Sequence, residues 1–289
     1  MDTATNEYSW DLRDERFLAV FFETAEFAST DKQWKSYLRF NLTAVDRGRQ
    51  LVNRLDAVRE IKGARVLDIG AGSGGIAIAL AERGATVDAI EPDPVRFRWA
   101  QARIEGHSAP VRLADEVAEK LPFEDATFDI VTLDSVIEHV ENPPQVVRET
   151  ARVLRPGGIV YMVTPNKSSL VNLLRDPHYQ MFGVVLMPRR LGRLYVERVR
   201  RIERGYWVNV IPTKRWFVRN FSRVGVDLEQ LVPDGFEKLT MRTVPIRAPA
   251  PARLLARLLV RLRMGSALHR LALAQYPTLI LLGRKAKES

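Results

Sequence analysis

The stretch Val66-Leu67-Asp68-Ile69-Gly70-Ala71-Gly72-Ser73-Gly74-Gly75 decides the fold of this chain. Its first four residues suit a short strand buried in a parallel sheet, and the apolar run from Ile76 to Leu80 suits a helix that packs back on that strand. The glycines lie at the bend, where a backbone without Cβ atoms takes positive φ and lies close to a ligand. Free N–H groups at the helix start favour an electron-rich group. The stretch therefore predicts a site for a nucleotide-containing cofactor.

The glycines alone leave the cofactor open. Gly70, Gly72 and Gly75 match the GxGxxG pattern of dinucleotide-binding proteins, which allows NAD or FAD. Asp68 is a poor neighbour for a pyrophosphate but a good acceptor for the ammonium group of an amino acid. Glu91 follows the predicted strand Thr86–Ile90 and can accept both hydroxyls of a ribose, as an acid in NAD enzymes also does.

Two further segments complete a set of four motifs. Residues 121–131 read LPFEDATFDIV, and residues 154–158 read LRPGG. In this order and spacing the motifs resemble the class I S-adenosylmethionine-dependent methyltransferases, over roughly residues 60–166. Within that family the chain looks most like the group of ubiquinone-biosynthesis O-methyltransferases and many small-molecule and glycan methyltransferases. The resemblance implies S-adenosylmethionine as cofactor and S-adenosylhomocysteine as product.

The resemblance also implies roles around the cofactor. Asp68 and the loop from Gly70 to Gly74 would hold the methionine part, Glu91 the ribose, and Pro92 and Asp93 would flank the adenine. Asp115 or Glu116 would meet the adenine amino group, although the next motif follows later than is usual in the family. The full expected set is Asp68, Gly70, Ala71, Gly72, Ser73, Gly74, Glu91, Pro92, Asp93, Asp115, Glu116 and Asp134, the last at the end of the predicted fourth strand.

The expected chemistry is an in-line transfer of a methyl group, which needs the acceptor about 3 Å from the methyl carbon. A hydroxyl acceptor must also lose its proton. His139 is the predicted base because SVIEHV, residues 135–140, follows the fourth strand at the pocket mouth and histidine titrates near neutral pH. Glu138 is assigned to the catalytic site with it. The alternative is that His139 packs or caps within its helix.

A divalent metal is not expected. In the ubiquinone O-methyltransferases an acidic-His element has been linked to such a metal, with a further acid three residues before the Glu-His pair. Here that position is Ser135, so the set is incomplete, and only the neighbouring Asp134 could replace the missing acid.

Composition bounds the class of protein. The 289 residues are 46% hydrophobic, enough for one large α/β domain or a domain with a substantial cap. The absence of cysteine excludes a disulfide framework, a thiolate nucleophile and a zinc-thiolate site, and favours a reducing cytoplasm. We expect no signal peptide, and no apolar run approaches the roughly 18 residues of a membrane span.

The net charge of +9 is concentrated in two segments. Residues 189–223 carry eleven Arg or Lys and two acids, and residues 247–270 carry six Arg and no acid. Residues 250–274 place arginines on one side of a predicted helix and leucines on the other. This basic amphipathic helix favours an anionic membrane surface or a lipid-linked substrate, and the alternative is a helix packed on the core with a solvated face.

We divide the chain into four parts. Residues 1–60 form an N-terminal helical lid whose aromatic rings mostly pack together, and residues 61–166 form the Rossmann-like core that binds S-adenosylmethionine. Residues 167–232 form an inserted basic cap, and residues 233–289 hold the C-terminal strands and the basic helix. The expected fold is a doubly wound α/β fold with a seven-stranded sheet, whose last strand, residues 276–283, is antiparallel at the sheet edge.

The cap holds the candidate substrate residues. His178 and Tyr179 form a second candidate acid/base pair, with loop packing as the alternative. Arg189 and Arg190 suit bidentate contacts to phosphate, with a solvated helix face as the alternative. His107 and His269 are expected at the surface.

Three functions follow from these patterns. The first is O-methylation of a hydroxyl on a small molecule, a sugar, or a lipid-linked glycan or quinone, in the cytoplasm or at the inner face of the membrane. The second is methylation of RNA or protein. A basic chain permits nucleic acid, but no Asn-Pro-Pro-Tyr type element follows the fourth strand, so nucleic acid is the less favoured partner. The third is a catalytically silent cofactor-binding scaffold. The oligomeric state is left open.

Overall fold

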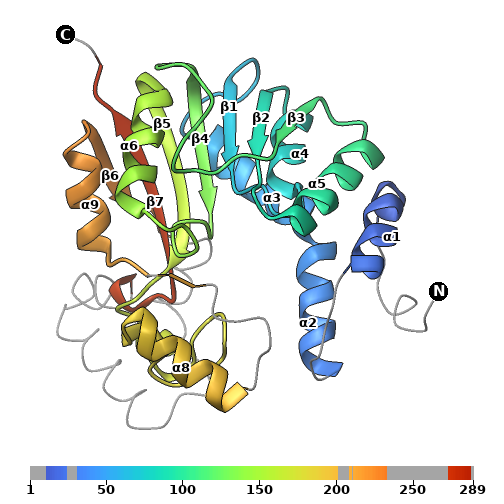
Figure 1. Ribbon diagram of the computed structural model, residues 1–289. Coiled ribbons are helices and arrows are strands. Elements are labelled where there is room, and N and C mark those ends of the chain that lie inside the picture. Colours follow the sequence, from blue (N-terminus) through green and yellow to red (C-terminus); the bar gives the residue numbers. More distant parts are fainter. Residues whose placement is uncertain (1–10, 25–30, 201–207, 210, 233–272, 288–289) are drawn as a thin grey trace, which may run out of the picture.

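Seven strands form one sheet in the order β3-β2-β1-β4-β5-β7-β6 (Figure 1). The computed structural model describes residues 11–24, 31–200, 208–209, 211–232 and 273–287. The strands are β1 Arg65–Ile69, β2 Thr86–Ile90, β3 Val111–Ala114, β4 Phe128–Asp134, β5 Leu154–Pro165, β6 Val226–Gln230 and β7 Thr278–Lys285. β1 pairs in parallel with β2 and β4, whereas β7 runs antiparallel to β5 and β6. The predicted fold class is confirmed.

Helices cover both faces of the sheet. They are η2 Leu12–Asp14, α1 Glu15–Thr24, α2 Asp31–Leu42, α3 Ala44–Asp56, α4 Gly75–Glu82, α5 Pro94–Gly106, α6 Pro143–Val153, α7 Leu170–Leu174, η3 Val184–Leu186, α8 Arg189–Arg200 and α9 Lys214–Ser222. Leu51, Leu55 and Leu80 bring α3 and α4 onto one face, and Val147 and Phe217 bring α6 and α9 onto the other. This double cover explains why residues 66–69 of β1 are all buried instead of alternating between buried and exposed.

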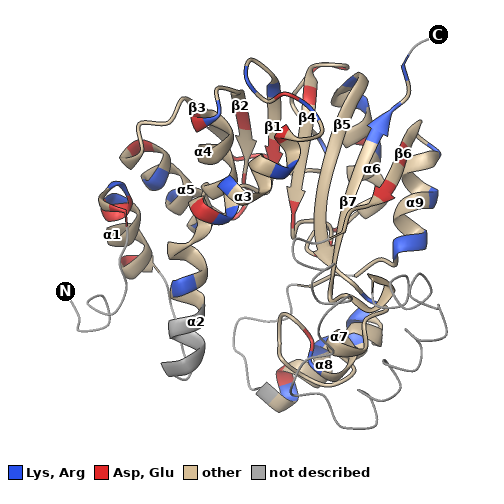
Figure 2. Cartoon of the chain, turned by 180° about the vertical axis from the view of Figure 1, so that it is seen from behind, with Lys and Arg blue, Asp and Glu red and all other residues tan. Residues whose placement is uncertain are grey.

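The topology gathers the strand ends that matter for function. Parallel strands joined by right-handed crossovers end at the same edge of a sheet, so β1, β2, β4 and β5 deliver the residues that follow them to one place. The segment with α8 lies beyond this part of the molecule (Figure 1). Seen from behind, α8 and α9 carry Lys and Arg residues (Figure 2).

The last strand is not at the sheet edge, as the sequence led us to expect. β7 lies between β5 and β6, and its residues 279–282 are buried because β6 covers its second side. β6 and α9 come from the range 167–232 and belong to the sheet and its helical cover, so the name cap is used below for the described residues between 167 and 213. The division of the chain into four parts stays a prediction. Nearly all of the predicted basic helix, residues 250–274, lies outside the described residues.

The N-terminal helices pack against α5 through aromatic rings. Phe21 lies 4.8 Å from Trp99 and 5.3 Å from Phe17, centroid to centroid, and both phenylalanines are fully buried. These rings are packing residues, as expected for most of this segment. Whether the helices act as a lid stays a prediction, and residues 1–10 and 25–30 lie outside the described part.

One histidine prediction is wrong. The side chain of His107 is 1% exposed, because η2 covers the end of α5 and places Asp14 Oδ1 3.0 Å from His107 Nε2. From sequence alone, a polar residue at a helix C-terminus is expected at the surface. Only the tertiary contact with η2 buries His107. His269 lies outside the described residues.

Candidate functional site

The glycine loop between β1 and α4 is held close to its neighbours. Gly70 has a φ of +71°, and a Cβ there would lie 2.6 Å from a methyl carbon of Val136 in the turn after β4. A Cβ on Gly75 would lie 2.5 Å from the backbone of Ala44 at the start of α3. Gly74 precedes α4 in the left-handed region and supplies no side-chain cap. The loop therefore presents bare backbone at a helix start, which suits an electron-rich ligand group.

Asp68 is a buried carboxylate with an unused oxygen. It is 1% exposed; its Oδ1 accepts a hydrogen bond of 2.6 Å from Thr132 Oγ1, and its Oδ2 is buried without a hydrogen-bond partner. Burial raises the pKa of Asp68 to about 7. Leaving a buried carboxylate oxygen unpaired is unfavourable, so the position suits a donor supplied by a ligand.

Glu91, directly after β2, braces the glycine loop. It is 4% exposed, and its carboxylate accepts the N–H of Gly72 at 2.7 Å and the N–H of Asp93 at 3.1 Å. Burial also raises its pKa. The Asp93 carboxylate is itself used as the N-cap of α5, where it accepts two backbone N–H groups. Sequence reasoning did not foresee this capping role.

The remaining predicted cofactor residues lie along the same edge. Pro92 is exposed beside Glu91, and Ala71 and Ser73 belong to the glycine loop. Asp115 is exposed and Glu116 half-buried in the segment after β3, the strand next to β2. Their proposed adenine contact stays a prediction.

The edge of the sheet gathers buried carboxyl groups. Burial raises the pKa values of Asp68, Glu91, Asp134 and Glu138, and repulsion from Asp134 raises those of Asp68 and Glu138 further. Four acids that resist ionisation together form a site that is short of positive charge. A ligand with cationic groups relieves this repulsion.

Arg47 of α3 was missed by sequence reasoning. Its Nη2 donates to the Phe40 carbonyl at 2.9 Å, its guanidinium lies 3.6 Å over the Phe40 ring, and its Nε is buried without a hydrogen-bond partner. Burial lowers its pKa, and the opposite charge of Asp134 counteracts that effect. Nothing in the sequence distinguishes Arg47 from Arg49 and Arg54 of the same helix, because only the packing turns it inward.

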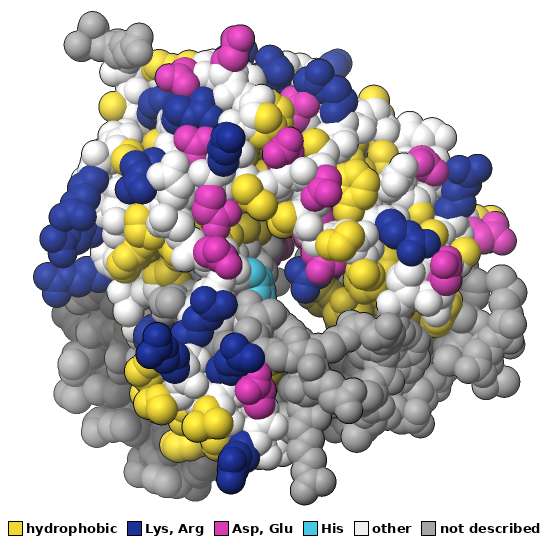
Figure 3. All heavy atoms as spheres, in the orientation of Figure 1, with side chains coloured by type: hydrophobic (Ala, Val, Ile, Leu, Met, Phe, Trp, Pro, Cys, Tyr) yellow, Lys and Arg dark blue, Asp and Glu magenta, His cyan; other side chains and the backbone are white. Residues whose placement is uncertain are grey.

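The turn after β4 and the cap bring three predicted catalytic residues together. Glu138 is fully buried and accepts from Thr164 Oγ1 at 3.2 Å, and its Oε1 lies 4.0 Å from His178 Nε2. The rings of His139 and His178 meet edge to face with centroids 5.2 Å apart. A histidine side chain is visible at the hollow of the molecule in Figure 3. Residues separated by about forty positions in sequence thus form one cluster.

The protonation states in this cluster differ from the usual ones. Burial raises the pKa of Glu138 to about 8, so its neutral form predominates at pH 7. Burial lowers the pKa of His178 to about 4, so this imidazole is neutral as well. The same three side chains offer ligand atoms within 4.8 Å of one another, which is the spacing of a cation site.

The cap residues are divided between core and surface. Tyr179 is 4% exposed within the core of the cap, and its hydroxyl accepts the Val208 N–H at 3.4 Å, which fits the packing alternative. Asn209 links the cap to the turn after β4, since its Nδ2 donates to the carbonyls of His139 and Val140 at 2.7 and 2.8 Å. Arg189 and Arg190 are exposed at the start of α8, and Arg189 lines a pocket within the cap.

Comparisons with known proteins decide the family. A family model described as a methyltransferase domain matches residues 67–162. Ubiquinone biosynthesis O-methyltransferase of Pseudomonas syringae pv. tomato is 34% identical over 167 residues, which cover 54% of this chain and 67% of that protein. The chain belongs to the class I S-adenosylmethionine-dependent methyltransferases.

Further relatives of this methyltransferase agree. Ubiquinone biosynthesis O-methyltransferase of Paracidovorax citrulli is 36% identical over 122 residues, 42% of this chain and 51% of the relative. The crystal structure of an S-adenosylmethionine-dependent methyltransferase from Mesorhizobium loti shares the fold, with a TM-score of 0.54 at 16% identity over 83% of this chain and all of that one. The chain spans between 51% and 67% of the length of these two curated relatives, so their names do not by themselves assign its acceptor.

The methyltransferase site fits the family's cofactor. S-Adenosylmethionine carries a sulfonium and an ammonium group. The edge of the sheet where β1, β2 and β4 end presents carboxyl groups with raised pKa values, and one of them, Asp68, has an oxygen without a hydrogen-bond partner. It also carries a carboxylate, for which the buried Nε of Arg47 is a donor without a partner.

Proposed function

We propose that this methyltransferase transfers the methyl group of S-adenosylmethionine to a hydroxyl of a small molecule, a sugar, or a lipid-linked glycan or quinone. The observation that carries this proposal is the cluster of Glu138, His139 and His178 beside the cofactor loop. The cluster follows Val136, whose side chain lies against Gly70. A base next to the sulfonium methyl is what hydroxyl acceptors need.

The cofactor is assigned as follows. Asp68 accepts from the ammonium group, Arg47 pairs with the carboxylate, and Glu91 accepts from the ribose hydroxyls while it holds the Gly72 N–H. Pro92 and either Asp115 or Glu116 meet the adenine. The cationic ends of the cofactor offset the repulsion among the buried acids, which supports this orientation.

The reaction then needs one proton transfer. Bound S-adenosylmethionine would supply an electrophilic methyl group to the acceptor oxygen, and His139 would take the proton of that hydroxyl. Burial raises the pKa of Glu138 and lowers that of His178, which favours the neutral form of both, and His178 packs against the ring of His139. We predict that the reaction proceeds without a divalent metal.

The surface of the cap favours an acceptor that is bound to a membrane or carries phosphate. Eight apolar side chains of the cap are more than half exposed: Leu170, Val171, Leu174, Phe182, Leu186, Leu191, Leu194 and Val199. Exposed arginines of α8 lie among them (Figure 3). Apolar side chains beside cations suit an anionic lipid surface. We therefore place the enzyme in the cytoplasm, peripheral at the inner face of the membrane.

The described helices do not suit a membrane span, since none of them is both long enough and sufficiently apolar. RNA or protein methylation is the second function that the basic surface allows, and a silent cofactor-binding scaffold is the third. The cluster of Glu138, His139 and His178 favours an enzyme over the scaffold, because a scaffold has no need of a base beside the cofactor.

The test begins with calorimetric titration of S-adenosylhomocysteine into the wild type, Asp68→Ala and Glu91→Ala, with NAD as the control ligand. We expect micromolar binding that both substitutions abolish. Acceptors with free hydroxyls, with phosphate groups and in lipid-linked form are then compared for methyl transfer. Binding of NAD in place of S-adenosylhomocysteine would overturn the proposal, as would methylation of RNA or protein alone.

A further inference from the structure

A buried arginine lies directly behind the cofactor loop. Arg103 of α5 is fully buried and uses three guanidinium nitrogens as donors. Nε donates to Asp14 Oδ1 at 2.9 Å, Nη1 to the Ser73 carbonyl at 2.8 Å and Nη2 to the Asn41 carbonyl at 2.9 Å. Because a guanidinium group holds its donors in one rigid plane, these three acceptors are fixed relative to one another.

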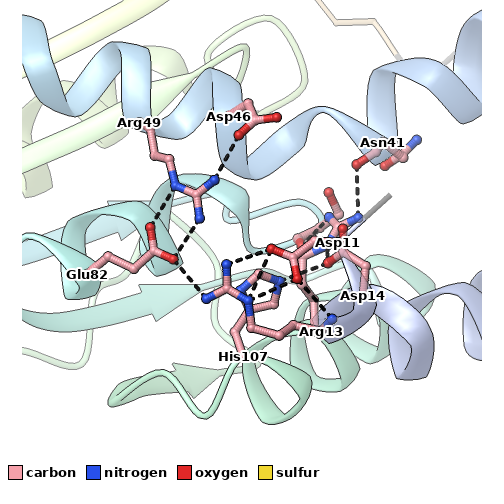
Figure 4. Close-up of polar contacts among 10 residues, drawn as sticks. Asp11, Arg13, Asp14, Asn41, Asp46, Arg49, Glu82 and His107 are labelled. Carbon is pink, nitrogen blue, oxygen red and sulfur yellow. Dashed lines mark hydrogen bonds and ion pairs between the residues drawn. The ribbon is translucent and has the colours of Figure 1, made fainter. Parts of the chain in front are cut away.

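The acceptors come from three different segments. Asp14 ends η2, Asn41 is in the last turn of α2, and Ser73 belongs to the glycine loop. Figure 4 shows Asp14, Asn41 and His107 converging from their separate helices. The Arg103 guanidinium also lies 3.4 Å over the Phe17 ring of α1. One side chain thus joins both N-terminal helices to the loop on which the cofactor is proposed to lie.

Because Arg103 is buried, its charge depends on these hydrogen-bond partners. Burial lowers the pKa of Arg103 to about 10, which still leaves the side chain charged at neutral pH. A buried charge is costly unless its partners are in place. Loss of the Ser73 carbonyl from its position would therefore also weaken the packing of η2 and α2, and displacement of these helices would release the loop.

We propose that Arg103 is a positioning residue that couples the docking of the N-terminal helices to the shape of the cofactor loop. This inference rests on the proposed function, since it requires the cofactor to bind at that loop. Coupling between two sites is reciprocal. A cofactor that fixes the loop therefore stabilises η2 and α1 on α5, and loss of the Arg103 contacts that join these helices to the loop weakens cofactor binding.

The chain offers a matched control. Trp99 Nε1 donates to Thr24 Oγ1 at 2.7 Å, which joins α5 to α1 directly and involves no atom of the glycine loop. Thr24→Val removes this bond with little change in volume. Arg103→Lys keeps the charge but loses the planar fork that reaches three acceptors at once.

The experiment measures two quantities in the full chain: the dissociation constant of S-adenosylhomocysteine by calorimetry, and hydrogen exchange of residues 12–24 with and without that ligand. We expect Arg103→Lys to weaken binding by about tenfold or more, the size of one charge-assisted hydrogen bond. The ligand-induced protection of residues 12–24 should disappear in this variant. Thr24→Val should lower the melting temperature and retain both the affinity and the protection.

Equal losses of affinity in the two variants would overturn the coupling, and so would an unchanged affinity and protection in Arg103→Lys. If the lysine variant does not fold, Asp14→Asn tests the same link, since it removes the counter-charge but keeps the size of the side chain. Failure of the wild type to bind S-adenosylhomocysteine would refute the proposed function itself. Tight binding by both the wild type and the Arg103 variant would refute only the present inference.

Discussion

Single residues in this site have properties that follow from burial. Asp68 is the clearest case, because its pKa of about 7 lies well above its ordinary value of 3.8. A carboxyl group whose pKa is higher in the folded state binds its proton more tightly there, so its contribution to stability falls as the pH rises from about 4 through 7. The residue is retained at a cost to the free protein, which is the expected pattern for a binding residue.

Asp68→Asn should therefore separate stability from binding. We expect its melting temperature to exceed that of the wild type by an amount that grows between pH 5 and pH 8, because asparagine does not ionise. Affinity for S-adenosylhomocysteine should fall by about a hundredfold at pH 8, through loss of a charge-assisted hydrogen bond in a buried site. Thermal melts across this pH range and calorimetry provide the two measurements. A pH-independent difference in melting temperature would refute the ionisation argument.

The base assignment is a second prediction at the residue scale. His139→Gln should lower kcat by about 10²- to 10⁴-fold, the usual contribution of a general base. The affinity for S-adenosylhomocysteine should be unchanged, because the substitution leaves the glycine loop intact. Steady-state kinetics with a responsive acceptor, together with calorimetry, would check this. A kcat within a few-fold of the wild type would return His139 to the packing role.

Among the elements, α8 has two different faces. Gly192 and Val196 are buried, whereas Leu191, Leu194 and four arginines are exposed, namely Arg189, Arg190, Arg193 and Arg198. A helix that keeps apolar residues on its solvent side has either a partner or a surface to meet. The positive charge of the arginines around these residues favours an anionic surface.

The apolar contribution can be tested with vesicles. Replacement of Leu191 and Leu194 by Ser should weaken binding to phosphatidylglycerol vesicles, measured by sedimentation, by about a hundredfold or more, since each lost side chain removes some 1.5 to 3 kcal/mol of transfer free energy at full burial. The control is Val218→Ser on α9, which removes an exposed apolar side chain outside the cap. Equal binding by all three proteins would exclude α8 as the contact.

The basic start of α8 makes a separate prediction. Replacement of Arg189 and Arg190 by Ala should raise the KM for a phosphate-bearing acceptor by about tenfold or more, as expected for bidentate contacts. Cofactor affinity should not change, because α8 is not part of the glycine loop. Parallel loss of both parameters would indicate a folding defect, and a constant KM would assign these arginines to the solvated face.

Across the whole molecule, the cluster of Glu138, His139 and His178 depends on contacts between the Rossmann-like core and the cap. Asn209 ties the cap to the turn after β4, and His178 reaches across to Glu138. Such an arrangement is chemically able to serve two purposes: proton transfer by His139, or coordination of a cation by all three side chains.

Metal removal distinguishes these purposes. We expect dialysis against EDTA to leave methyl transfer unchanged, because Ser135 stands where the family's metal set has an acid. Activity assays before and after dialysis, with Mg²⁺ and Zn²⁺ added back, provide the measurement. A loss restored by one of these ions would assign Glu138, His139 and His178 as its ligands.

The sequence by itself determined the class of fold and predicted the location of the cofactor loop. Strand, glycine turn and helix are local patterns, and the four motifs keep their order along the chain, so residues such as Asp68 and Glu91 could be named without coordinates. The burial of Asp68 follows from the same patterns, since a central parallel strand is covered on both faces.

The tertiary structure alone decided what distant segments do together. It placed β7 inside the sheet, buried His107 against Asp14, turned Arg47 inward and brought His178 to Glu138. Each of these depends on contacts between residues far apart in the chain, and local hydrophobic periodicity contains no information about such pairings. The linkage of Arg103 to Asp14, Asn41 and Ser73 is of the same kind. The sequence named the cofactor loop, and the packing of three separate segments on one guanidinium fixed its surroundings.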